Sequence, residues 1–424
     1  MHPESTSTKK TKILNAAVIV ASLGYFVDIY DLLLFGIIRI KSLQSLGLNK
    51  EQIEEVGLAL INYQMAGLLI GGIFWGILGD KRGRLSVLFG SILLYSVANI
   101  ANGLIDGENA IVWYKIWRVV AGLGLAGELG AGITLVAEVL PKEKRGIGTM
   151  IVASIGISGA VAAYFVSQAF GENWRACYFI GGGLGLALLL LRVSVVESGM
   201  FHNSKQQTNV SRGNYLKFFT NGDRFKRYLK CILVGMPTWY VVGILVFFSN
   251  SFAEKLEVKG TVDPGKAIMI CYAALTFGDL ASGAISQWLK SRKKVLYIFY
   301  TMTLVSVLLY FSAHGVSVTT FYAICGLLGF SVGFWAIFVT MAAEQFGTNF
   351  RAMAATTAPN YARGMLNLIT PIFLYLQVGL KDYFGSPYLA SGLITGLLCI
   401  LIAFVAAITS KETFGKDLDY VEEE

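Results

Sequence analysis

Two aspartates, Asp28 and Asp31, lie in the stretch GYFVDIYDLLLFG, inside an apolar run from residue 15 to 38. A carboxylate near the centre of a membrane span costs about 2.5–3.5 kcal/mol on insertion scales, so its presence there indicates a function. Residues three apart share one face of a helix, and two carboxylates in a low dielectric cannot both stay ionised cheaply. We therefore expect one of them to carry a proton, with Glu128 as a further candidate. Polar contacts between helices are the alternative role for the pair.

An arginine in a later apolar run, Arg363, offers the complementary chemistry. It lies in the run 352–380, where an isolated cation is costly unless it faces a cavity or a partner. A guanidinium binds carboxylate or phosphate in a bidentate way, so Arg363 is predicted to bind an anionic substrate. Extension towards the membrane surface is its alternative role. Further candidates for the substrate site, with packing as the alternative for the aromatic ones, are Arg118, Asn360, Tyr361, Asn367, Trp239 and Tyr240.

The elements that hold these side chains are predicted to be membrane-spanning helices. The chain has 424 residues, 55% of them hydrophobic and 15% charged, with a mean hydropathy of +0.60, which is more apolar surface than a soluble core can bury. Apolar runs of about 20 residues indicate transmembrane helices. The sequence predicts an all-α membrane protein with twelve of them, at residues 15–38, 56–79, 85–105, 111–140, 147–170, 176–196, 229–252, 266–289, 295–313, 317–343, 352–380 and 386–409.

The positions of Lys and Arg predict the orientation of these helices. Of the 35 such residues, 22 fall in the two terminal segments and in the loops on their side. Cytoplasmic loops are rich in positive charge, so both termini are predicted to be cytoplasmic, in an inner or plasma membrane. The net charge of +8 then reflects topology and contact with anionic lipid rather than nucleic-acid binding.

The chain contains an internal repeat. Glu138 and Arg145 in AEVLPKEKRG recur 206 residues later as Glu344 and Arg351 in AEQFGTNFRA, and GILGDKRGR from Gly76 is followed at an offset of 207 by GAISQWLKSRKK. Each half has six spans of the same orientation, which predicts two parallel repeats with the substrate site between them at mid-membrane. The predicted units are an N-terminal six-helix bundle, a cytoplasmic linker, and a C-terminal six-helix bundle with its tail, at residues 1–196, 197–228 and 229–424.

These motifs resemble those of the major facilitator superfamily over nearly the whole chain, and GILGDKRGR is similar to its loop between spans two and three. The segments VDIYDLLLFG, RVVAGLGLAGELG, NWRACYF and VVESGMF resemble those of its metabolite:proton symporter group. The chain departs from that group in having Asp28 where Glu is common, and Ala126 before the Gly that precedes Glu128. The resemblance implies the major facilitator fold and favours Asp31 as the proton carrier.

The resemblance also implies a cytoplasmic gate. Asp80 would meet a helix N-terminus of the other half, where the helix dipole favours an anion, and Arg84 would pair with Glu138. Anchoring of the basic loop to lipid head groups is the alternative. The predicted gate residues are Gly76, Asp80, Arg84, Glu138, Arg145, Glu344 and Arg351.

Motifs of other function classes fail on their context. GLGLAG, residues 122–127, fits a dinucleotide fingerprint but lies inside an apolar span, which indicates close helix packing. GTVDPGKA, residues 260–267, lacks the Ser or Thr of a phosphate loop. The three histidines lie in the tail or in loops and the five cysteines show no ligand spacing, so no metal site, disulfide framework or enzymatic centre is predicted.

Together these features predict a secondary active transporter. We expect proton-coupled symport of a small organic anion or zwitterion, such as a carboxylate, by alternating access. The proton is the coupling ion and no other cofactor is expected. The expected partners are the small-molecule substrate, protons and membrane lipid, with no nucleic acid, and the chain is expected to act as a monomer. Two alternatives stay open: proton-driven export of amphipathic compounds, and a non-transporting membrane sensor of the same fold.

Overall fold

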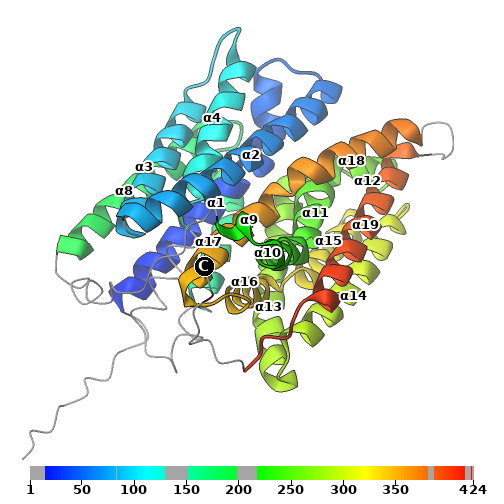
Figure 1. The fold of residues 1–424 in the computed structure, drawn as a ribbon. Helices are drawn as coiled ribbons and strands as arrows, with labels where there is room; N and C mark the ends of the chain where they lie inside the picture. Colours follow the sequence, from blue (N-terminus) through cyan, green and yellow to red (C-terminus); the bar gives the residue numbers. More distant parts are fainter. Residues whose placement is uncertain are drawn as a thin grey trace, which may run out of the picture.

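The computed structural model describes residues 15–82, 84–128, 151–197, 217–380, 386–415 and 422 of the chain. These residues are almost entirely helical (Figure 1). The helices of the N-terminal half are α1 (Ala16–Ser45), α2 (Lys50–Arg82), α3 (Arg84–Gly103), α4 (Ala110–Leu125), a helical segment Ile151–Ala169 that contains α7 (Gly159–Ala169), and α8 (Trp174–Glu197).

The C-terminal half contains more interruptions. Its helices are α9 (Lys217–Thr220), α10 (Gly222–Val234), α11 (Met236–Tyr240), the π-helix Val241–Val246, α12 (Ser249–Lys255), α13 (Pro264–Leu289), α14 (Arg292–Phe311), α15 (Val318–Ser331), α16 (Trp335–Glu344), α17 (Thr348–Gly364), α18 (Leu366–Gly379) and α19 (Pro387–Thr409).

The helices are long and apolar enough for a membrane protein. Ten spans in the described residues meet that criterion, and the helix pair α17 and α18 forms the eleventh predicted span. The fourth predicted span begins with α4 and continues outside the described residues. Large apolar side chains are exposed on the outer surface, among them Leu190, Phe277 and Val378, as expected where lipid replaces water as the solvent. The chain is therefore an all-α membrane protein, and the described residues contain ten such spans, the α17 and α18 pair, and the start of the fourth predicted span.

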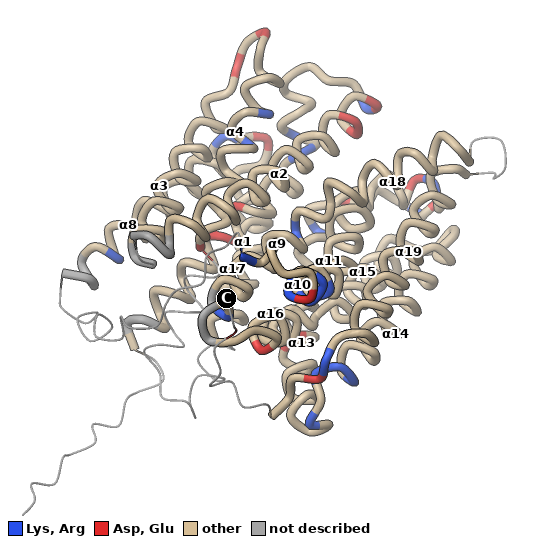
Figure 2. Tube along the Cα trace, in the orientation of Figure 1, with Lys and Arg blue, Asp and Glu red and all other residues tan. Residues whose placement is uncertain are grey.

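The two repeats form two bundles that meet along a central interface (Figure 1). Within the bundles α2 packs on α4, α3 on α8, and α13 on α15, while α2 meets α17 and α7 meets α13 across the interface. The GLGLAG stretch is a packing motif, because a side chain on Gly122 would collide with the backbone carbonyl of Gln64 on α2. Charged residues gather towards the helix ends and along α10, and a smaller number lie within the bundles (Figure 2).

The face of the bundle opposite the start of α1 and the end of α19 is closed by contacts between the halves. Lys50 Nζ lies 2.6 Å from Glu254 Oε2, and the buried Arg39 donates a 3.0 Å hydrogen bond to Asn250 Oδ1. The guanidinium of Arg39 also stacks over Phe248, 4.1 Å from its ring centroid. This conformation therefore holds α1 and α2 against α12 at that face.

Helix α10 begins at Gly222, inside the range 197–228 that was predicted as a linker. Asn221 caps its N-terminus by accepting hydrogen bonds from two backbone N–H groups. Arg224 and Arg227 of its polar turns bind the carboxylate of Glu422, 3.1 and 2.9 Å away. A polar helical turn carries no hydropathy signal. The predicted span therefore begins at residue 229, several residues after the observed start of α10.

Candidate functional site

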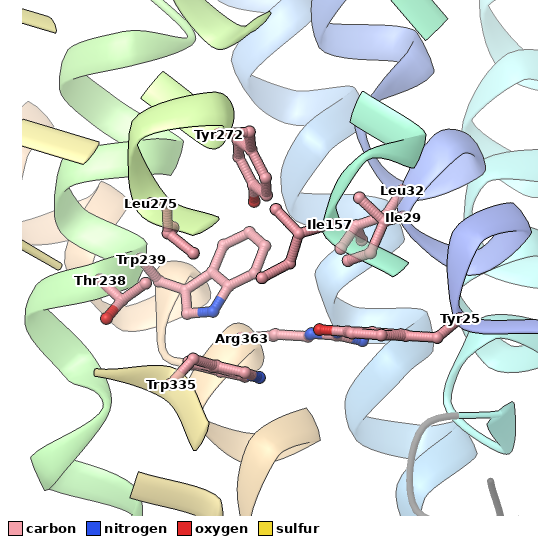
Figure 3. A pocket seen from close by; sticks show the side chains of 10 residues that line it. All are labelled: Tyr25, Ile29, Leu32, Ile157, Thr238, Trp239, Tyr272, Leu275, Trp335 and Arg363. Carbon is pink, nitrogen blue, oxygen red and sulfur yellow. The ribbon is translucent and has the colours of Figure 1, made fainter. Parts of the chain in front are cut away.

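A narrow cavity lies between the two bundles. Three of its lining residues, Tyr25, Ile29 and Leu32, follow helical spacing along one face of α1 (Figure 3). The others come from the helix before α7, from α11, α13 and α17, and from the first residue of α16: Ile157, Thr238, Trp239, Tyr272, Leu275, Trp335 and Arg363. Both halves contribute, so the cavity is placed where rocking of one half against the other would expose it to either side.

The helices of the C-terminal half are interrupted at the level of this cavity. The π-helix follows Tyr240, residues 332–334 separate α15 from α16, and α17 contains Pro359 and ends at Gly364. Asp279 of α13 accepts a 2.8 Å hydrogen bond from the backbone N–H of Ala336, in the first turn of α16. Irregular backbone at membrane depth is tolerated where it lines a cavity and its polar groups have hydrogen-bond partners. Asp279 is such a partner for the free N–H group at the start of α16.

Arg363 and Asp28 meet inside the interface. Both are buried, and Arg363 Nη1 lies 3.7 Å from Asp28 Oδ2. Nε and Nη1 of Arg363 and both oxygens of Asp28 have no hydrogen-bond partner among the described residues. A buried donor without a partner carries a cost of about 1–3 kcal/mol, so this pair is incompletely satisfied. The arrangement presents a cation with free donors to a ligand in the cavity.

Asp31 takes a different environment from Asp28. It is buried in the N-terminal half against Gly181 of α8, whose missing side chain leaves space for the carboxylate, whereas Asp28 faces Arg363. Neither aspartate lines the cavity. Residues three apart on a helix differ by about 60° in direction. Because α1 is packed between α8 and the C-terminal half, this difference directs Asp28 to Arg363 and Asp31 to α8.

Glu128 forms a buried ion pair with Arg192 of α8. Arg192 Nη1 lies 3.0 Å from Glu128 Oε2, and Nη2 donates to Oε1, which makes the pair bidentate. Gly24 of α1 packs directly against both side chains, where a Cβ would collide with them. The pair thus joins three helices of one bundle, and Glu128 does not line the cavity.

Arg192→Ala is expected to lower the free energy of unfolding by about 3–5 kcal/mol, because it leaves Glu128 as an uncompensated buried charge. Thermal unfolding of the purified protein measures this. Arg192→Ala combined with Glu128→Gln should recover much of the loss. Arg175→Ala is the control: its partner Asp106 is exposed, and the loss of this pair, of a hydrogen bond to the Ile105 carbonyl and of a contact with the Trp174 ring should cost less than the loss of a buried ion pair. Equal losses for Arg192→Ala and Arg175→Ala would contradict a structural role for the pair.

The remaining predicted substrate residues divide into two groups. Trp239 lines the cavity with Arg363. The other five are engaged elsewhere: Arg118 donates to Gln64 and stacks on Phe35, Asn360 donates to the carbonyl of Ala126 at 2.7 Å, Tyr240 donates to Gly392, Tyr361 packs near Tyr228, and Asn367 donates to Gly364. Asn360 thereby joins the two halves beside the cavity instead of lining it.

The predicted gate is described only in part. A Cβ on Gly76 of α2 would lie 3.6 Å from Thr357 of α17, so this glycine sits at the interface of the halves. Glu344 pairs with Arg292 at 3.1 Å and accepts a hydrogen bond from Thr413, while Arg351 lies on α17. The side chains of Asp80 and Arg84, and residues Glu138 and Arg145, lie outside the described part of the structure.

Most of the cavity lining was missed by sequence reasoning, although the repeat contains a signal for part of it. Arg363 and Trp239 correspond at offsets of 206 and 207 to Ile157 and Leu32, and all four line the cavity. Applying the offset to known candidates would have found these two. Arg192 and Asp279 were missed because their partners are distant in sequence.

Two six-helix halves with a charged and aromatic cavity at their interface are the architecture of a transport protein. The family profile described as Major Facilitator Superfamily matches residues 17–362, and the chain belongs to this superfamily. Members of this superfamily are transporters and not enzymes, and so is this chain.

Relatives in sequence are transporters of small metabolites. The niacin transporter NiaP of Acinetobacter baylyi is 25% identical over 396 residues, which cover 85% of this chain and 87% of that protein. The putative niacin/nicotinamide transporter NiaP of Bacillus subtilis is 24% identical, covering 94% and 96%. A putative proline/betaine transporter of Staphylococcus aureus is 30% identical over 287 residues, covering 62% and 59%.

Solved structures share the fold. The proton:xylose symporter XylE bound to 6-bromo-6-deoxy-D-glucose superposes with a TM-score of 0.70 at 15% identity, covering 95% of this chain and 97% of its own. The partially occluded inward-open conformation of XylE from E. coli gives a TM-score of 0.69, with 95% and 99% covered. At this identity the likeness concerns the arrangement of helices.

Proposed function

We propose that the protein is a proton-coupled symporter of a small organic anion, a carboxylate-type metabolite. The observation that supports this most directly is the buried contact of Asp28 and Arg363, 3.7 Å apart at the interface of the halves, where Arg363 also lines the cavity. A cation with unpartnered donors suits an anionic ligand, and the neighbouring carboxylate suits a proton.

The coupling follows from competition for one guanidinium. An ionised Asp28 neutralises Arg363, so a second carboxylate there would meet like-charge repulsion at low dielectric. Protonation of Asp28 removes that charge and frees Arg363 to bind the substrate. Loss of the proton on the other side of the membrane restores the ion pair and releases the substrate. Since Asp28 is on α1 and Arg363 on α17, this exchange alters the contact between the two moving halves.

The substrates for which these relatives are named fit this chemistry. Niacin, proline and betaine are small molecules that each carry a carboxylate, and proton coupling is named for the structural neighbour XylE. These names support the proposed class of substrate, while the cavity of this chain supports the proposed residues.

The same proposal includes the domain units, the membrane orientation and the cytoplasmic gate. The units 1–196, 197–228 and 229–424 act as bundle, linker and bundle, and the monomer is the transporting unit in the plasma membrane, with both termini cytoplasmic. No cofactor is needed other than the proton. Gly76 and its associated charged residues would open and close the cytoplasmic side.

Transport in sealed vesicles tests the function. We expect the purified chain to accumulate a labelled carboxylate when the opposite side is more acidic, because one pH unit supplies about 1.4 kcal/mol, enough for about tenfold accumulation of a monoanion carried with one proton. A thermal-shift screen of carboxylates, amino acids and betaines selects the probe, since a ligand that binds the folded state raises its apparent stability. A protonophore should abolish the accumulation.

Other outcomes point to the alternatives. Accumulation of amphipathic compounds that does not require Arg363 would favour an exporter. Ligand binding without movement of any bound ligand across the vesicle wall would favour a sensor. Either result would overturn the proposed symport.

A further inference from the structure

Two tryptophans share the cavity with Arg363, whose guanidinium carbon lies 5.9 Å from the ring centroid of Trp335. Trp239 of α11 and Trp335 of α16 both line the cavity, and their indoles lie on different sides of the Arg363 side chain in Figure 3. They are 3% and 8% exposed, and neither indole N–H has a hydrogen-bond partner among the described residues. A buried indole N–H usually finds a partner, so these two donors are available to a ligand.

Apart from Thr238, the rest of the lining is aromatic or aliphatic. Tyr25 and Tyr272 add two further rings, from α1 and α13. The hydrogen bond from the backbone N–H of Ala336 to Asp279 holds the first turn of α16, and with it the backbone of Trp335, against α13. The cavity therefore combines a cation, two indole donors and several aromatic rings on defined helices.

We propose that the site selects planar aromatic carboxylates over saturated or neutral analogues. The carboxylate would accept from Arg363 and from an indole N–H, and the flat ring would pack against the indoles. This inference rests on the proposed function and narrows its substrate class. An aromatic cage can also hold an ammonium group, but the positive charge of Arg363 within this cage opposes a cation.

Three small molecules separate the contributions of the negative charge and of the aromatic ring to binding. Benzoate is planar and anionic, cyclohexanecarboxylate is anionic but saturated, and benzamide is planar but neutral. Favourable aromatic pairs contribute about 0.5–1.5 kcal/mol beyond buried area, so ring contacts on two sides predict benzoate binding about tenfold more tightly than cyclohexanecarboxylate. Benzamide should bind more weakly than either, because it lacks the charge that Arg363 requires.

Titration calorimetry on the purified full chain measures these affinities. Trp239→Leu and Trp335→Leu should each reduce the preference for benzoate, whereas Trp239→Phe and Trp335→Phe should retain much of it. Trp288→Leu is the matched control, because Trp288 lies on α13 with 81% exposure and does not line the cavity.

The outcomes distinguish this inference from the function on which it rests. Equal affinity for benzoate and cyclohexanecarboxylate would overturn the aromatic selection and leave carboxylate transport standing. Binding of benzamide as tight as benzoate would overturn the anion clamp. If neither carboxylate binds to the folded native protein, the proposed function itself fails.

Discussion

Asp28→Asn is expected to abolish the accumulation of a carboxylate driven by a pH gradient, while exchange of labelled for unlabelled substrate continues. Asn keeps the shape and hydrogen-bonding capacity of a protonated Asp but cannot ionise. Exchange requires only that the loaded carrier rocks, whereas uphill uptake requires a proton to be released in each cycle. The accumulation ratio should fall from about ten per pH unit to one.

Binding gives a second readout of the same substitution. In the native protein the affinity for substrate should fall as the pH rises, because ionised Asp28 competes with the substrate for Arg363. In Asp28→Asn the competitor is absent at every pH, so the affinity should become independent of pH. A variant that had merely lost its fold would lose binding and exchange as well.

Asp31→Asn is the matched control, three residues along the same helix. Asp31 lies against Gly181, whereas Asp28 is the aspartate paired with Arg363, so substitution of Asp31 should preserve accumulation. The opposite pattern, with Asp31→Asn inactive in accumulation and Asp28→Asn active, would assign the proton to Asp31, as the family resemblance favours. If both variants still accumulate substrate, the pair is not the coupling site. Glu128 would then have to be tested despite its engagement with Arg192.

The fold was predictable from the sequence because it depends on long and simple signals. Apolar runs exceed the length needed to cross a bilayer, and the repeat of Glu138 and Arg145 as Glu344 and Arg351 indicates two parallel halves. The start of α10 is among the least accurate boundaries. Its first turns carry Arg224 and Arg227, which are paired with the distant Glu422, and hydropathy cannot detect a helix of this kind.

The site was predictable only where a residue is unusual for its surroundings. Asp28 and Arg363 stand out as charges within apolar runs, and the structure brings them together from opposite halves. Trp335 gave no such signal, because a tryptophan in a membrane span resembles any packing residue until the break before α16 places it at the cavity. Arg118 is also a charge within a span, yet Gln64 and Phe35 engage it inside the N-terminal half. Which charges meet is decided by tertiary contacts.

Arg363→Lys is expected to weaken carboxylate binding about 10- to 100-fold, although the charge is kept. A guanidinium holds a carboxylate through two parallel hydrogen bonds, whereas an ammonium acts as a point charge, and a hydrogen bond to a charged group contributes about 1.5–3 kcal/mol. Calorimetric titration with the carboxylate selected by the thermal-shift screen measures the loss. Lys can still neutralise the buried Asp28, so the variant should fold, which Arg363→Ala would not guarantee.

Arg118→Lys provides the comparison for this substitution. Arg118 is as deeply buried as Arg363 but contacts Gln64 and Phe35 and does not line the cavity, so its replacement should change stability more than affinity. Unchanged affinity in Arg363→Lys would show that the fork is not used and that the aromatic walls bind the substrate without it. That result would favour export of amphipathic compounds, because the aromatic walls can bind such compounds without the two parallel hydrogen bonds that a guanidinium gives to a carboxylate.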